Sequence, residues 1–177
     1  MAAQPRRWGW HRLDSRWAAT LVDEAGVAAG DLVVDVGAGT GAITVPLLSR
    51  GARVVAVELH AARAAALRER LGRDGVTVVV CDAADLRLPR RPFRVVANPP
   101  FAITTAVLRR LTAPGSRLVR ADLVVPRHVA ERWASGRAPG SGRWRHAFDA
   151  RVGRAVPARA FSPPATGPVA VLVVTRR

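Results

Sequence analysis

Several residue types are scarce or missing in this chain of 177 residues. It has no lysine and no tyrosine, a single asparagine, a single glutamine and two isoleucines. A GC-rich coding bias produces this pattern, because the missing types have AT-rich codons. An asparagine that survives such a bias is expected to be needed for its chemistry, and that asparagine is Asn98.

The single cysteine, Cys81, excludes an internal disulfide and a zinc site built from cysteines. No apolar run approaches the ~18 residues that span a membrane. Arg6 and Arg7 are followed by no apolar core, so a secretory signal is not expected. The length and the 49% apolar content suit one domain. We expect a cytoplasmic monomer without a metal or a membrane partner.

All 28 basic residues are arginines, and the net charge is +15. Residues 126–177 hold ten arginines against two acidic residues, and residues 1–17 hold four against one, whereas residues 18–125 hold fourteen against ten. Because guanidinium groups fork onto phosphate and stack on bases, these basic ends favour a nucleic-acid partner. Coding bias explains why arginine replaces lysine, but it does not explain why arginines outnumber acidic residues.

Residues 6–17 interleave three tryptophans with four arginines. This pattern is typical of a segment that contacts single-stranded nucleic acid or covers a small ligand. Tryptophans packed beneath a following helix explain it equally well. We expect that helix over residues 15–25, with an Asp14 or Ser15 cap and with Gly26 at its end.

A buried strand after Asp31 runs into a glycine turn with the spacing Asp35-x-Gly37-x-Gly39-x-Gly41. The last gap is shorter than in the dinucleotide-binding fingerprint. The turn predicts that a ligand approaches the backbone closely, beside a helix N-terminus that can face an anionic group. Pro46 is expected to distort the first turns of that helix.

Acidic residues follow the next two predicted strands, residues 53–57 and 76–81. Glu58 stands twenty-one residues after Gly37, where a βαβ unit places the acid that accepts two ribose hydroxyls. Asp82 could accept the exocyclic amine of a cofactor adenine, or it could simply cap a loop.

The fourth predicted strand, residues 94–97, ends in Asn98-Pro99-Pro100-Phe101. The N6 amine of adenine is a weak nucleophile because its lone pair is delocalised into the ring. A side-chain carbonyl and a backbone carbonyl that accept its two N–H bonds would localise and aim that lone pair. The prolines remove competing backbone donors, and Phe101 offers a face for stacking. An ordinary strand-ending turn is the alternative.

The remaining pattern predicts a helix over residues 104–111, a strand over 118–125, a helix from Pro126 to Gly136, a mobile basic loop over 134–146, and strands over 148–152 and 169–175. Ligand-type residues at successive strand ends predict an α/β, Rossmann-like fold. We expect a mostly parallel seven-stranded sheet with helices on both faces.

The glycine turn, Glu58, Asp82 and the Asn98 motif, in this order, resemble adenine-N6 methyltransferases that use S-adenosyl-L-methionine. Val156-Pro157-x-x-x-Phe161-x-Pro163-Pro164 resembles the ribosomal-RNA adenine dimethyltransferases, and Gly9 to Leu13 resembles the opening of actinobacterial Erm macrolide-resistance enzymes. The resemblance covers nearly the whole chain. It implies a class I methyltransferase that modifies an adenine of 23S rRNA at the macrolide-binding loop.

The resemblance also implies roles for individual residues. Cofactor contacts would be His11, Leu13, Gly37, Gly39, Glu58, Asp82, Ala83 and Asn98; catalytic residues would be Asn98, Pro99 and Phe101; and RNA contacts would be Phe101 and Phe161, joined by Arg6, Arg7, Arg143 and Arg145 of the basic segments. A sulfonium is already a good leaving group, so no general base is assigned and the four histidines are not expected to be catalytic.

We expect a basic, tryptophan-rich segment over residues 1–17 and one catalytic domain over residues 18–177, without a separate C-terminal helical domain. Two departures from the family stand out: its usual Gln-Asn-Phe element is Trp10-His11-Arg12 here, and its helical lobe does not follow the last strand. Three alternatives remain open: a small-subunit rRNA dimethyltransferase, a DNA adenine methyltransferase, which shares the Asn98 motif but not the Phe161 segment, and a non-catalytic RNA-binding protein that retains the fold.

Overall fold

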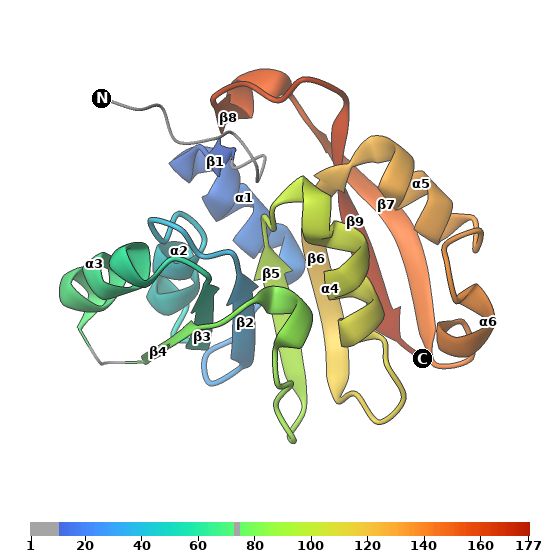
Figure 1. Ribbon diagram of the computed structural model, residues 1–177, viewed down its shortest axis with the longest axis horizontal. Coiled ribbons are helices and arrows are strands. Elements are labelled where there is room, and N and C mark those ends of the chain that lie inside the picture. The colour runs from blue at the N-terminus through green and yellow to red at the C-terminus, as the bar shows by residue number, and fades with distance from the viewer. Residues whose placement is uncertain (1–10, 73–74) are drawn as a thin grey trace.

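A computed structural model describes residues 11–72 and 75–177. Its centre is a seven-stranded sheet with the order β4-β3-β2-β5-β6-β9-β7 (Figure 1). In chain order the strands are β2 (Leu32–Val36), β3 (Arg53–Glu58), β4 (Val76–Val80), β5 (Phe93–Ala97), β6 (Leu118–Pro126), β7 (Phe148–Val156) and β9 (Val169–Arg176). The first five pair in parallel, whereas β9 runs antiparallel to β6 and β7. The sheet is therefore mixed, and the predicted parallel pairing is confirmed for β2 to β6.

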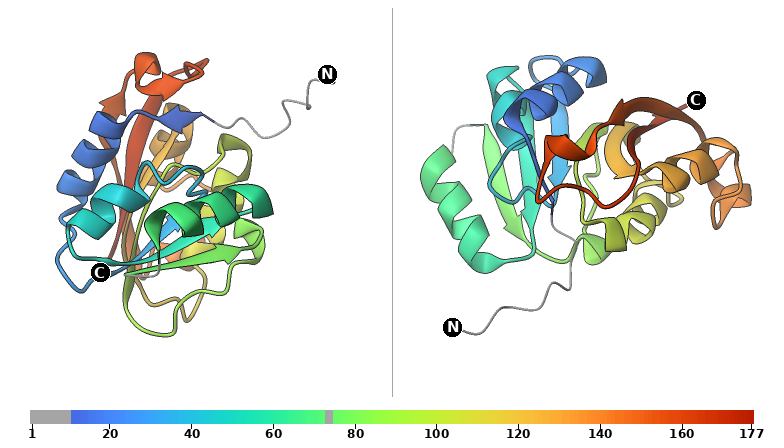
Figure 2. Two further views of the ribbon diagram at one scale, coloured as in Figure 1. Left: turned by 90° about the vertical axis from the view of Figure 1, so that its left-hand side faces the viewer. Right: turned by 90° about the horizontal axis from the view of Figure 1, so that it is seen from above.

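Helices pack on both faces of the sheet (Figure 2). Side chains of α1 (Ser15–Ala25), α2 (Thr44–Ser49) and α3 (Ala61–Leu71) pack into one core, and those of α4 (Thr104–Leu111), α5 (Arg127–Ala134) and α6 (Ser141–Trp144) into the other. Val33 and Val34 of β2 point into opposite cores. An apolar run without alternation is what a strand covered on both faces requires.

The N-terminal helix and the glycine loop follow their sequence signals closely. Asp14 Oδ1 accepts a hydrogen bond from the Arg16 N–H at 2.9 Å, so the helix begins as predicted, and Gly26 ends it in a left-handed conformation. The expected distortion at Pro46 stays a prediction. Helix α2 begins only at Thr44, so Pro46 lies in its first turn, where no intrahelical N–H donor is needed.

The predicted loop over residues 134–146 is wrong in part, because residues 135–140 lie outside helices and strands but the chain from Ser141 to Trp144 is helical. This segment contains α6, and the Trp144 ring stacks on Trp133 of α5 with 4.6 Å between ring centroids. Ala138 and Trp144 are both buried. The glycines, serine and arginines around them resemble a loop in composition, but the buried tryptophan pair fixes the segment against the sheet.

Two segments far apart in the sequence form a second, two-stranded sheet. Strand β1 (Arg12–Leu13) pairs antiparallel with β8 (Phe161–Ser162) near the upper edge of the large sheet in Figure 1. The Asp14 N–H donates to the Ala160 carbonyl at 2.8 Å. The 3-10 turns η1 (Ala83–Asp85), η2 (Phe101–Ile103) and η3 (Ala158–Ala160) complete the fold. No helix among the described residues is long and apolar enough to cross a membrane.

Candidate active site

The glycine loop lies where the parallel strands end. The N–H groups of Gly37 and Ala38 both donate to the Val57 carbonyl of β3, at 2.8 and 2.9 Å. Gly37 has a φ of +76°, and a Cβ placed there would lie 3.1 Å from Cδ of Pro100. Glycine is therefore required for both the conformation and the close approach of the two loops.

Glu58 is fixed in one orientation at the end of β3. Its Oε2 accepts a hydrogen bond from the Gly39 N–H and its Oε1 accepts one from the His60 N–H, both at 2.9 Å. Arg63 Nε lies 3.7 Å from the same Oε1. The Glu58 side chain is 4% exposed. Each carboxylate oxygen keeps a lone pair for a ligand hydroxyl, so the position suits the predicted ribose contact.

Glu58 and Asp82 line one pocket that opens to solvent. Asp82 Oδ1 accepts a hydrogen bond from the Ala84 N–H at 2.9 Å, so this residue does cap a turn, as one interpretation expected. Asp82 also lines the pocket. Because the turn uses Oδ1, Oδ2 can accept a hydrogen bond from a ligand. The other lining residues are Gly37, Val57, Leu59, His60, Arg63, Cys81, Ala83, Pro100 and Ile103.

Asn98 lies at the end of β5 beside a second pocket of about 310 Å³. Its Nδ2 donates to the His11 carbonyl at 2.7 Å, which fixes the orientation of the amide. Its Oδ1 is buried and has no hydrogen-bond partner among the described residues. A buried acceptor without a partner costs about 1–3 kcal/mol, so it is expected to accept from a ligand. Gly37 lines both pockets, which places them on either side of one loop.

Asp35 is a site residue that the sequence analysis did not assign. It lines the second pocket and is 1% exposed, and Thr44 Oγ1 donates to its Oδ2 at 2.7 Å. Burial raises the pKa of this carboxyl from 3.8 to about 7, and nearby Glu58 adds to the effect. The sequence did contain a signal for Asp35 as a site residue, because Asp35 is the first residue of the Asp-x-Gly-x-Gly-x-Gly spacing.

Three rings from distant parts of the chain meet beside Asn98. The His11 ring lies 5.6 Å from that of Phe101 and 6.3 Å from that of Phe161, and the two phenylalanine rings are 6.4 Å apart. His11 Nδ1 also lies 2.9 Å from the Pro163 carbonyl, which ties the imidazole to the segment after β8. The β1–β8 pairing thus assembles an aromatic cluster of His11, Phe101 and Phe161.

The structure brings most of the predicted residues together at the carboxyl ends of the parallel strands. His11, Leu13, Gly39 and Asn98 line the second pocket, whereas Gly37, Glu58, Asp82 and Ala83 line the first. Pro99 and Phe101 adjoin them in the chain. Arg143 lies in α6, shortly before the start of β7 and away from both pockets, and Arg145 directly follows this helix. Arg6 and Arg7 lie outside the described residues.

Comparisons with known proteins agree with this site. The family model described as "Ribosomal RNA adenine dimethylase" matches residues 12–177. A ribosomal RNA small subunit methyltransferase A of Leifsonia xyli subsp. xyli is 41% identical over 138 residues, which cover 73% of this chain and 48% of that protein. An rRNA adenine N-6-methyltransferase of Bacillus licheniformis is 31% identical over 161 residues, which cover 89% of this chain and 56% of that protein.

Among solved structures, the 23S rRNA methyltransferase ErmE superposes with a TM-score of 0.80 and 26% identity, over 95% of this chain and 70% of that one. The chain spans about half the length of the two curated relatives. Because the family model covers all of the described residues except His11, the chain belongs to the ribosomal RNA adenine dimethylase family.

Proposed function

We propose that this protein is a class I methyltransferase that transfers a methyl group from S-adenosyl-L-methionine to N6 of an unpaired adenine in ribosomal RNA. The observation that carries the proposal is the amide of Asn98: its Nδ2 donates to the His11 carbonyl, and its buried Oδ1 has no hydrogen-bond partner among the residues that the structure describes. This acceptor, beside an aromatic cluster, suits a planar base with an exocyclic amine.

The donor set suits the cofactor. Glu58 and Asp82 would take the ribose hydroxyls and the adenine amine in the first pocket, and Gly37 would let the cofactor pass close to the backbone. In the second pocket Asp35, once ionised, would pair with the ammonium group of the methionine arm. When bound, the cofactor supplies an electrophilic methyl group on a sulfonium.

The chain's own residues orient the acceptor amine. Asn98 Oδ1 accepts one N–H bond and holds the nitrogen lone pair in line, which needs positioning more than a strong base. The Pro100 carbonyl accepts from the Ile103 N–H at 3.0 Å and is committed to the turn. The Pro99 carbonyl is therefore our candidate for the second acceptor. Phe101 and Phe161 would stack on or abut the base and exclude water.

For the target we propose an adenine of 23S rRNA at the macrolide-binding loop, with resistance to macrolide, lincosamide and streptogramin B drugs as the consequence. The ErmE likeness and the Gly9 to Leu13 stretch support this target. A small-subunit adenine is the second candidate, and the 41% identity to the Leifsonia protein favours it.

The test is methyl transfer from labelled S-adenosyl-L-methionine to purified large-subunit and small-subunit RNA, with the modified nucleotide mapped by primer extension. We expect a stop at the macrolide-site adenine, whereas a stop only in small-subunit RNA would select the second candidate. Asn98→Ala should abolish transfer and leave RNA affinity within about twofold, because one neutral side chain is lost and no phosphate contact. Wild-type turnover in that variant would refute the mechanism.

A further inference from the structure

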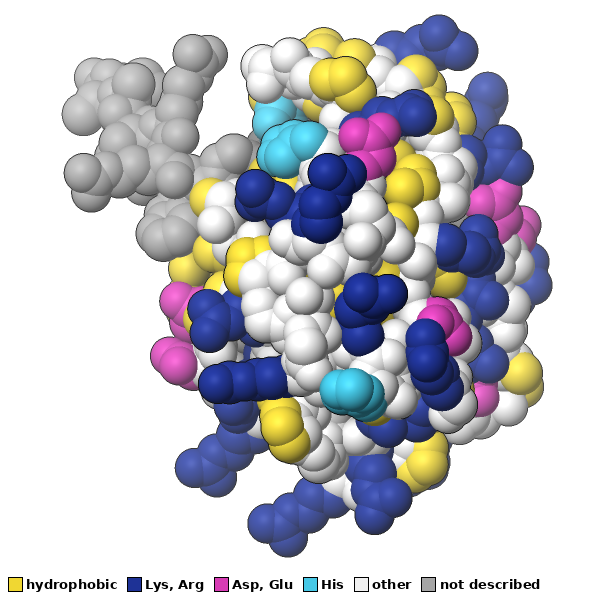
Figure 3. Space-filling view, turned by 90° about the vertical axis from the view of Figure 1, so that its right-hand side faces the viewer, with side chains coloured by type: hydrophobic (Ala, Val, Ile, Leu, Met, Phe, Trp, Pro, Cys, Tyr) yellow, Lys and Arg dark blue, Asp and Glu magenta, His cyan; other side chains and the backbone are white. Residues whose placement is uncertain are grey.

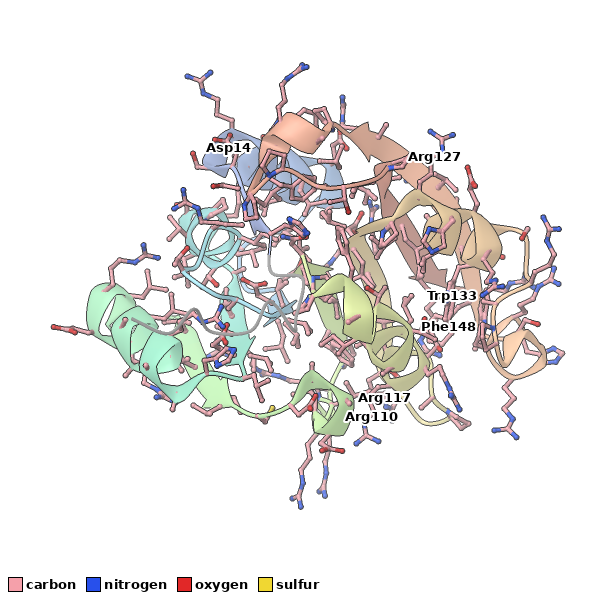
Figure 4. The ribbon with its side chains drawn as sticks, turned by 45° about the horizontal axis from the view of Figure 1, so that its top comes forward. Asp14, Arg110, Arg117, Arg127, Trp133 and Phe148 are labelled. Carbon is pink, nitrogen blue, oxygen red and sulfur yellow. The ribbon has the colours of Figure 1, made fainter. Side chains whose placement is uncertain are left out.

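A second concave surface lies at the end of the sheet where β5, β6 and β7 begin, opposite the end that carries the active site. Two adjoining hollows of about 980 and 820 Å³ share the turn at residues 113–117 as a common wall. Among the residues that the structure describes, no acidic residue lines them and five arginines do: Arg90, Arg110, Arg117, Arg143 and Arg176. We call this surface the basic groove. Figure 4 shows Arg110 and Arg117 together at the end of the molecule away from Asp14.

The chain topology separates the basic groove from the catalytic pockets. Pro92 lines the groove and precedes β5, whereas Asn98 follows β5 at its other end. Five strand residues span roughly 17 Å at about 3.3 Å per residue. Arg117 and Phe148 likewise stand at the starts of β6 and β7. The groove is therefore a separate surface and not an extension of the active site.

The charges of the groove are not compensated within the protein. Arg90, Arg117 and Arg143 are exposed, and their side chains form no hydrogen bond or ion pair in the part of the chain that the structure describes. Arg110 Nε donates to the Leu86 carbonyl at 2.8 Å, and Arg176 Nε donates to the Leu118 carbonyl at 2.7 Å. These neutral acceptors leave both guanidinium charges in place.

Arginines elsewhere on the surface fall into two groups. Seven of them lie within ion-pair distance of carboxylates: Arg50 of Asp23, Arg63 of Glu58, Arg94 of Asp31, Arg120 of Asp122, Arg127 of Glu131, Arg154 of Glu24 and Arg177 of Asp149. Others, such as Arg53, Arg132 and Arg151, are exposed, and their side chains form no hydrogen bond or ion pair with the described residues. Figure 3 shows blue and magenta side chains side by side over much of one face, with blue alone at its lower end. The groove therefore differs from the rest of this surface in its shape and its lining, because five arginines face two adjoining hollows that no described acidic residue lines.

We propose that the basic groove binds the phosphodiester backbone of RNA at a distance from the target adenine. Guanidinium groups match phosphate geometry, and the partly apolar floor suits sugar and base edges. Phe148 forms part of that floor, with the Arg176 guanidinium 4.5 Å from its ring centroid. The inference rests on the proposed RNA substrate, and it adds a second anchor that holds a long RNA while one adenine occupies the catalytic site.

The test variant is Arg90→Gln/Arg117→Gln/Arg143→Gln, which removes three charges from side chains without intramolecular partners. The matched control, Arg53→Gln/Arg132→Gln/Arg151→Gln, removes the same charge from exposed arginines that line neither hollow. Both variants should unfold thermally like the wild type. Retention of labelled RNA on filters is measured over a range of salt concentrations, with a large-subunit fragment of several hundred nucleotides and with a short hairpin carrying the target adenine.

For the long RNA, the groove variant should bind about tenfold more weakly or worse at 0.1 M salt, and its log–log salt slope should fall by about 2 to 3, as three lost phosphate contacts require. Its affinity for the hairpin should stay within about twofold of the wild type, because a short RNA bound at Asn98 does not reach the groove. The control should bind both RNAs nearly as the wild type does.

An unchanged salt slope, an equal loss in the control variant, or an equal loss for the hairpin would overturn the groove proposal. Wild-type protein that retains no long RNA would overturn it as well. Methyl transfer to the hairpin is measured in parallel. Its absence would refute the proposed reaction but would not alter the outcome for the groove, which is decided by binding alone.

Discussion

Replacing Asp35 with asparagine should stabilise the ligand-free protein in a manner that depends on pH. The carboxyl is buried beside Glu58, and its pKa is about 7 instead of 3.8. In the unfolded chain the same group ionises near its ordinary value. Between these two pH values the folded protein holds a proton that the unfolded chain releases, so the free energy of unfolding falls as the pH rises.

The size of this effect follows from the two pKa values. Below about pH 4 the group is protonated in both states and costs nothing. Above about pH 7 it is ionised in both, and the full cost of a buried charge remains, at most about 4 kcal/mol at ~1.4 kcal/mol for each pH unit between the two pKa values. Asparagine carries no charge and retains an oxygen that can accept from Thr44 Oγ1. It therefore avoids this cost.

Thermal unfolding at pH 5 and pH 8 measures the difference. At pH 8 Asp35→Asn should melt about 5–15 °C above the wild type, at about 2–4 °C per kcal/mol for a chain of this size. The gain should shrink markedly at pH 5, and affinity for S-adenosyl-L-methionine should fall because the anionic partner of its ammonium group is lost. An equal melting-temperature difference at both pH values would refute the reasoning, because the Asp35 pKa would then be unshifted.

Two further substitutions test the glycine loop and the tryptophan pair. Gly37→Ala should weaken cofactor binding, measured by calorimetry, at least about tenfold. The control is Gly26→Ala, because Gly26 has a similar positive φ but nothing lies within 4 Å of a Cβ placed there. This control should lose only the backbone strain of about 1–2 kcal/mol from its free energy of unfolding. Trp144→Ala should lower the free energy of urea unfolding by about 3–5 kcal/mol, because the ring is buried against Trp133. Trp144→Phe should cost less, since the indole N–H has no hydrogen-bond partner in the described part of the chain. A loss below about 1 kcal/mol in the alanine variant would contradict the packing role.

The parts of the fold that could be predicted are those with local causes. Strands buried on both faces, glycine turns and helix caps leave signals within a few residues, so β2 to β6 and α1 were found near their true bounds. Residues at the ends of parallel strands meet at one edge, which is why Glu58, Asp82 and Asn98 could be grouped in advance.

What could not be predicted depends on contacts between distant residues. Nothing near Asn98 in the sequence indicates that the His11 carbonyl will orient its amide. The apolar character of Trp144 was hidden among glycines and arginines, and its partner Trp133 lies in another helix. The raised pKa of Asp35 arises from burial, which periodicity alone does not quantify.

The pairing of β1 with β8 has a consequence for the order in which the site can form during synthesis. A nascent chain that has emerged as far as residue 126 already contains β2 to β6, both acidic strand ends and the glycine loop. It lacks Phe161 and the Pro163 carbonyl, which hold His11 against Phe101. The cofactor side can therefore fold first, whereas the pocket for the base waits until the ribosome has added some forty more residues.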